Sequence, residues 1–223
     1  MIRILIIDDL PEPTFIEQMK QTIEGSFSGE IVEAKHVNPV TLLAGGTNKE
    51  SLDSLLVAIQ NEAKEFWDVV IIDVNLAEVK LPEDQRLDLS LIIAERIRET
   101  NHSATIMLYS GTLSDHVQKL LGGAVPPEAA LKKIFKGGIS QFVRRDMVAR
   151  EVLSAVDNPS WLLRVDRLLM KHAGIVVGPE EAEFKGRSFA ELAMAVRRQD
   201  HDGQKITQLT AEFGVACFAD LNS

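Results

Sequence analysis

Five short segments rich in apolar residues mark the first two thirds of the chain, and each is followed by a segment with helical spacing. An aliphatic run without polar alternation is typical of a strand that is buried on both faces of a parallel sheet. The near-continuous runs Ile2–Ile7 and Val69–Asp73 have this pattern. A second, weaker strand starts with Ile31–Ala34, and the fourth and fifth strands are predicted at Ala104–Tyr109 and Ile139–Val143. Because strands and helices alternate, the pattern predicts an α/β fold: an open parallel sheet with right-handed crossovers and helices on both faces.

Between these runs, apolar side chains recur three and four residues apart, which is the period of an amphipathic helix. The main stripes lie in Phe15–Phe27, Leu52–Phe66, Leu89–Ile97 and Met147–Val156. We expect Asp146 to cap the last of these helices. Two insertions lengthen the connections, one at residues 38–48 and one at 122–136, and Ser114–Leu121 is predicted to be helical.

The last third of the chain follows a different pattern. Beyond Asn158–Pro159 no strong strand appears, and three amphipathic stretches cover Trp161–Leu169, Phe189–Val196 and Ile206–Phe213. We therefore predict two domains, residues 1–157 and a small all-α module over 158–223. The first stretch carries an apolar stripe that must be buried somewhere, which favours a homodimer or docking on another protein.

Composition narrows the class of protein. The net charge of −9 argues against non-specific binding to nucleic acid or to an anionic membrane. The single cysteine, Cys217, excludes an internal disulfide and suits a reducing compartment. No apolar stretch is long enough to span a bilayer. We expect a cytoplasmic protein without direct contact to nucleic acid or membrane.

Three carboxylates follow two of the predicted strands. Asp8 and Asp9 end the first apolar run and Asp73 ends the third. Parallel α/β sheets place their chemistry beyond the carboxyl ends of the strands, so these side chains are expected to converge if the two strands are neighbours. A divalent cation reduces the repulsion between neighbouring carboxylates, and because the ligands are oxygens we expect this cation to be Mg²⁺.

The order of these features resembles a response-regulator receiver domain of two-component signalling. The resemblance covers roughly residues 1–156 and rests on the Asp pair, Asp73, Ser110–Gly111 and the segment Gly138–Arg145. It implies a flavodoxin-like five-stranded sheet in the order 2-1-3-4-5. It also implies a sensor histidine kinase or phosphotransfer protein as a partner, a further protein as output partner, and no enzymatic activity beyond self-phosphorylation and dephosphorylation.

The resemblance also implies roles for individual residues. Asp73 would accept the phosphoryl group, Asp9 and Asp73 would ligate Mg²⁺ directly, Asp8 would act through a bound water, and the backbone carbonyl of Asn75 would complete the ligand set. Ser110 and Arg145 would contact phosphoryl oxygens.

Phe142 occupies the position of an aromatic switch residue, although an ordinary half-buried strand aromatic explains it equally well.

The corner after the fifth strand departs from the family. Where receivers carry Lys followed by Pro, this chain has Arg145 followed by Asp146. Arg is a larger, planar donor than Lys, and without Pro a cis bond costs about 2.5–4 kcal/mol, so we expect a trans bond and a rearranged corner.

Three hypotheses about function follow. The first is a Mg²⁺-dependent phosphoacceptor whose phosphorylation at Asp73 switches protein–protein interaction. The second is a pseudo-receiver that binds partners without phosphate. The third is a small Mg²⁺-dependent phosphohydrolase, ranked last because Asp8 lacks the Asp-x-Asp partner of such enzymes.

Overall fold

The structure is a computed structural model. It describes residues 1–9, 13–27, 31–42, 48–65, 67–76, 79, 89–111, 134, 136–178 and 184–221. The chain divides into two compact units, Met1–Asn158 and Pro159–Ser223, which are treated separately below. The predicted domain boundary follows Asp157, one residue before this division.

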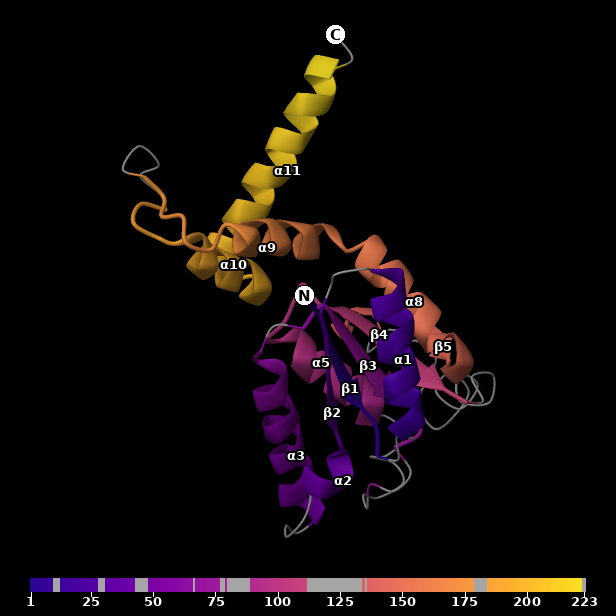
Figure 1. The fold of residues 1–223 in the computed structure, drawn as a ribbon. Helices are drawn as coiled ribbons and strands as arrows, with labels where there is room; N and C mark the ends of the chain where they lie inside the picture. Colours follow the sequence, from indigo (N-terminus) through magenta and orange to yellow (C-terminus); the bar gives the residue numbers. More distant parts are fainter. Residues whose placement is uncertain are drawn as a thin grey trace. The chain divides into compact units, whose positions relative to one another are not determined.

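The first unit is built on one parallel sheet of five strands (Figure 1). The strands are β1 (Ile2–Ile7), β2 (Val32–Val37), β3 (Val69–Asp73), β4 (Thr105–Ser110) and β5 (Ile139–Arg144). They lie in the order β2-β1-β3-β4-β5, and every neighbouring pair is parallel. This is the predicted flavodoxin-like order, so the predicted fold class is confirmed.

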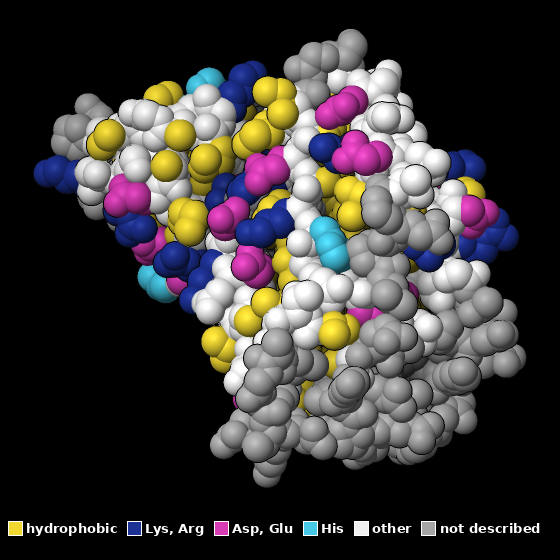
Figure 2. Space-filling view, turned by 60° about the horizontal axis from the view of Figure 1, so that its bottom comes forward, with side chains coloured by type: hydrophobic (Ala, Val, Ile, Leu, Met, Phe, Trp, Pro, Cys, Tyr) yellow, Lys and Arg dark blue, Asp and Glu magenta, His cyan; other side chains and the backbone are white. Residues whose placement is uncertain are grey.

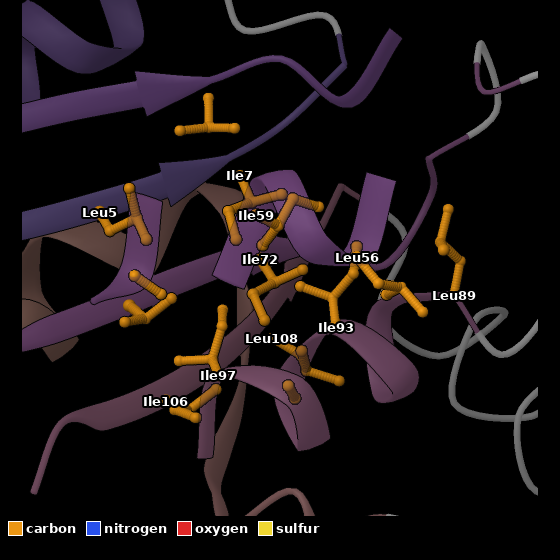
Figure 3. Packing of buried hydrophobic residues seen from close by; sticks show 14 of the residues in the cluster. Leu5, Ile7, Leu56, Ile59, Ile72, Leu89, Ile93, Ile97, Ile106 and Leu108 are labelled. Atoms are coloured by element: carbon orange, nitrogen blue, oxygen red, sulfur yellow. The ribbon is translucent and has the colours of Figure 1, made fainter. Parts of the chain in front are cut away.

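Two pairs of helices cover the two faces of this sheet. Residues that alternate along each strand separate into two buried clusters, as the period of a strand requires. On one face, α3 (Asn48–Ala63) and α5 (Leu89–Arg98) pack on side chains such as Ile7, Ile72 and Leu108 (Figure 3). On the other face, α1 (Pro13–Ser26) and α8 (Val148–Asp157) pack on the neighbouring residues of the same strands, among them Ile6, Ile71 and Met107.

A half-buried arginine contacts the segment in which strand β5 starts. The Arg98 guanidinium, at the end of α5, donates to the carbonyl oxygen of Gly138 over 2.9 Å. Gly138 has a φ of +58°, and a Cβ at this position would lie 2.5 Å from the Arg98 Nε. Burial lowers the pKa of Arg98 to about 10, which leaves it charged at neutral pH. A side chain at residue 138 would therefore disturb the link between α5 and the edge strand.

Several local predictions differ from the structure. Strand β2 starts one residue later than expected and runs on to Val37, and the first insertion contains a short helix, α2 (Pro39–Leu42). Asp146 does not cap α8: it lies in the 3-10 helix η1 (Arg145–Met147), and Met147 is the N-cap residue. Residues 112–133, which include the predicted helix 114–121, lie outside the described residues, as does most of the second insertion.

The second unit is helical, as predicted. Its helices are α9 (Trp161–Lys171), α10 (Phe189–Arg198) and α11 (His201–Leu221). Its core is formed by Val165, Leu192, Val196 and Ile206. At Gly203 an added Cβ would lie 2.0 Å from the carbonyl oxygen of Ala195, so α10 and α11 approach closely only because this residue has no side chain.

The interior of this unit also contains an ion pair. The Arg197 Nε donates to the Asp166 carboxylate over 2.7 Å, and both side chains are buried. Val165 and Leu169 of the α9 stripe pack within the unit, whereas Leu168 is 61% exposed. The unit's own helices therefore cover Val165 and part of Leu169, and the homodimer stays a prediction.

Within the described part of the chain, no helix combines the length and apolarity that crossing a membrane requires. On the face shown in Figure 2, acidic and basic side chains are interspersed, with hydrophobic ones between them.

Candidate functional site

Asp8, Asp9 and Asp73 converge at the carboxyl edge of the sheet. Ile7 and Ile72 are partners in the register between β1 and β3, so the residues that follow them, Asp8 and Asp73, lie side by side. Each of the three carboxylates offers an oxygen within 4.8 Å of the others. Asp8 and Asp9 are buried, with 2% and 4% of their surfaces exposed. These carboxylates form what we call the acidic site.

Two polar side chains at the carboxyl end of β2, one in the strand and one just after it, bind the backbone of this site. The Nε2 of His36 donates to the carbonyl oxygen of Asp8, and the Nδ2 of Asn38 donates to the carbonyl oxygen of Asp9, each over 2.8 Å. Sequence analysis assigned neither residue to the site, because it identified only the start of the second strand, Ile31–Ala34. A strand that continues to Val37 brings both residues to the edge where β1 ends.

The acidic site has the electrostatics of a cation site. Burial raises the pKa of Asp73 to about 6, and the neighbouring Asp8 and Asp9 add to this shift. The backbone N–H of Asn75 opposes it by donating to the Asp73 Oδ1 over 3.0 Å. The donors are all oxygens, and the carboxylates repel one another, which fits Mg²⁺. The Asn75 carbonyl as a fourth ligand stays a prediction.

Tyr109, which sequence analysis did not select, brings a hydroxyl group to the acidic site. Tyr109 is the register partner of Asp73, and it is 1% exposed. Its hydroxyl donates to the Asp8 Oδ2. Burial and this hydrogen bond raise the pKa of Tyr109, so the phenol stays protonated. Tyr109 could have been identified only from the register of β3 and β4, which pairs it with Asp73.

Ser110 is buried one residue further along β4, where it pairs with Arg144 of β5. Side chains alternate along a strand, so the side chain of Ser110 is directed to the opposite face from that of Tyr109. Its predicted contact with a phosphoryl group stays a prediction.

The two adjacent arginines at the corner after β5 differ in burial and in the groups that they contact. Arg144 is exposed and donates twice to the Asp146 carboxylate, over 3.1 and 2.6 Å. Arg145 is half-buried, and its guanidinium carbon is 5.2 Å from the centroid of the Phe15 ring. Within the described residues, its Nη2 is buried and has no hydrogen-bond partner. No described peptide bond is cis, so the expected trans bond between Arg145 and Asp146 is confirmed.

Phe142 is half-buried and packs against the cluster beneath α3 and α5, opposite the face that carries Tyr109. A switch role for Phe142 stays a prediction.

A hollow of about 660 Å³ opens between α1 and α8, beside Arg145. Its lining includes Phe15, Gln18, Thr22, Gly111, Arg144 and Arg145. It therefore adjoins the acidic site through Arg145 and Phe15.

Comparisons with known proteins return structural neighbours only. No family model and no curated protein matches the chain. One similar structure is a LuxR family DNA-binding response regulator from Silicibacter pomeroyi, at 18% identity and a TM-score of 0.37 over 70% of this chain and 89% of the other. Another is RcsB from Salmonella enterica serovar Typhimurium, bound to promoter rprA in the presence of phosphomimetic BeF3-, at 16% identity and a TM-score of 0.37 over 100% of both chains.

The sequence identities and TM-scores of these neighbours are low. The assignment of the fold therefore rests on the strand order and on the helices that cover both faces of the sheet. On that basis, the predicted resemblance to a receiver domain is confirmed at the level of the fold. The prediction of no direct contact with nucleic acid stays a prediction.

Proposed function

We propose that this protein is a signalling receiver whose Asp73 accepts a phosphoryl group in a Mg²⁺-dependent reaction. The observation that carries the proposal is the convergence of Asp8, Asp9 and Asp73 within 4.8 Å at the carboxyl edge of a doubly wound sheet. Carboxylates at this spacing repel one another, and two of them are buried, so a positive charge would stabilise the site.

Asp9 and Asp73 would hold Mg²⁺ directly, with Asp8 acting through water and the Asn75 carbonyl completing the set. When bound, the cation supplies positive charge that offsets the repulsion between the carboxylates and an incoming phosphoryl group.

In the transfer itself, an oxygen of the Asp73 carboxylate attacks the phosphorus atom of the donor. The new bond joins that oxygen to phosphorus, while the bond from phosphorus to the leaving group breaks and its electron pair leaves with that group. With a phosphohistidine donor, the broken bond is P–N, and the imidazole departs. Arg145 contributes positive charge from the end of β5, and the N–H of Asn75 orients the attacking carboxylate.

The second unit would carry the response to a protein partner. It contains an apolar hollow of about 430 Å³, lined by residues that include Leu169, Val177, Phe184, Phe189 and Ile206. Ile175, Val176 and Leu209 beside it are 49%, 57% and 44% exposed. Exposed apolar side chains grouped around a hollow are typical of surfaces that bind other proteins.

The direct test is intact mass after incubation with acetyl phosphate and Mg²⁺. The proposal predicts the addition of one phosphoryl group to the wild-type chain, and none with EDTA or in the variant Asp73→Asn. The matched control is Asp53→Asn, which removes an exposed carboxylate on α3. Continuous turnover of acetyl phosphate without a stable adduct would indicate the phosphohydrolase instead.

One observation favours the pseudo-receiver as a second candidate. The Tyr109 hydroxyl satisfies the Asp8 carboxylate without a cation, so part of the site is stable when empty. If no adduct forms under any of these conditions and Mg²⁺ produces no heat in calorimetry, this second candidate replaces the first.

A further inference from the structure

We infer that Tyr109 is a positioning residue of the acidic site. Tyr109, Phe15 and Arg145 contact one another in series, and this column of three side chains connects occupancy of the acidic site to the hollow between α1 and α8. The inference rests on the proposed function in one respect, since the occupant is taken to be Mg²⁺. The Tyr109–Asp8 bond itself can be tested without any metal.

The first step is the bond between Tyr109 and Asp8. The phenol is fully buried and donates to a carboxylate that is itself one of the three acidic-site groups. A divalent cation drawn to this site withdraws negative charge from the Asp8 carboxylate, which weakens any hydrogen bond that the carboxylate accepts. Cation binding therefore weakens the hydrogen bond from Tyr109 to Asp8, and this hydrogen bond in turn weakens cation binding.

The second step is the aromatic contact with α1. The rings of Phe15 and Tyr109 are stacked, with centroids 5.6 Å apart and an angle of 22° between their planes. Tyr109 belongs to the close-packed cluster beneath α1 and α8, and Phe15 packs against that cluster. In such a core, a ring that shifts by even a fraction of an ångström displaces its neighbour.

The third step reaches the surface of the unit. The Arg145 guanidinium lies over the same Phe15 ring at 5.2 Å, and both residues line the hollow between α1 and α8. A change at Tyr109 would thus alter the cation–π contact, and with it the shape and charge of the hollow.

The chain contains a single tyrosine, which makes this column directly observable. The full-length protein is labelled with 3-fluorotyrosine, so that its ¹⁹F NMR spectrum contains one resonance, from residue 109. We expect Asp8→Asn to shift this resonance in the metal-free protein, Mg²⁺ to shift it in the wild type, and Asp53→Asn to leave it in place. A resonance that does not respond to Asp8→Asn overturns the positioning role.

Calorimetry with Mg²⁺ separates this inference from the proposed function. Tyr109→Phe removes the competing donor and should bind Mg²⁺ about three- to tenfold more tightly, the effect of losing one net hydrogen bond. A merely structural role predicts unchanged or weaker binding, and that result overturns the inference. Heat of binding in the wild type without a shift of the ¹⁹F resonance also overturns it, while the proposed cation site stands. Absence of heat overturns the cation site, and the Asp8→Asn spectrum alone then decides the role of Tyr109.

Discussion

The ends of β1 and β3 and the ends of β4 and β5 lie along one edge of the sheet but carry different chemistry. The first half presents three carboxylates on strands that are buried along most of their length. The second half presents a tyrosine, a serine and two arginines, and its outer strand, β5, is mostly half-buried or exposed. The comparison shows that β1 and β3 are packed on both faces, whereas the outer strand β5 is less tightly packed, and we expect β5 to be the less rigid side of the edge.

The largest expected effect concerns the rigidity of the two strands. Ile72 of β3 is fully buried, and Ile139 of β5 is half-buried. Ile72→Ala should lower the free energy of unfolding by about 2–5 kcal/mol, and Ile139→Ala by about 1–2 kcal/mol. Urea unfolding followed by fluorescence measures both. Equal costs would contradict the expected difference in rigidity between the two strands.

The next effect concerns the cation. Asp9→Asn removes a charge from the buried acidic site and should weaken Mg²⁺ binding at least about tenfold, a loss seen even for partners outside the ligand set. The exposed carboxylate of Asp53 provides the control, since Asp53→Asn should leave the affinity unchanged. If the two variants bind Mg²⁺ equally well in calorimetry, the acidic site is not the site of binding.

A smaller effect follows from the raised pKa of Asp73. Because this pKa is about 6 in the folded protein and near 4 in the unfolded chain, its contribution to stability is present at low pH and is lost as the pH rises through 6. Asp73→Asn cannot ionise, so at about pH 7 the metal-free variant should be about 1–2 kcal/mol more stable than wild type. Chemical denaturation in EDTA at several pH values tests this. A gain that is the same at pH 4 and pH 7 would show that ionisation is not its cause.

The smallest effect belongs to the outer arginine. Arg144 and Asp146 form an ion pair whose side chains are 60% and 63% exposed. Exposed ion pairs contribute little to stability, so Arg144→Ala should change the free energy of unfolding by less than about 0.5 kcal/mol. Thermal unfolding in low and high salt checks this expectation. A larger, salt-sensitive loss would mean that the β5 corner is held more firmly than this comparison assumes.

The same two halves show what a sequence can predict. Aliphatic runs that end in aspartate identify β1 and β3 without reference to any neighbour, because burial on both faces leaves a continuous apolar pattern. The position of Tyr109 beside Asp73 depends on the register between two strands, which no local pattern records. His36 and Asn38 were missed for a related reason, since β2 is less apolar and its end is determined by pairing with β1.

The corner after β5 and the second unit depend even more on tertiary contacts. The resemblance to receivers predicts a basic residue at Arg145, but only packing determines that its guanidinium lies over Phe15. In the second unit, the helical pattern predicts the helices, whereas the close approach at Gly203 and the buried pair of Arg197 with Asp166 arise when the helices pack.

The central claim is that the acidic half performs cation-dependent phosphoryl transfer at Asp73. Its most direct test is the site of modification: after incubation with acetyl phosphate and Mg²⁺, the adduct is reduced with borohydride and located by peptide mass spectrometry. The account predicts that Asp73 is the single modified residue. The modification disappears with EDTA and persists in Asp53→Asn. A label on another carboxylate, or one that forms equally in Asp73→Asn or without a divalent cation, would contradict it.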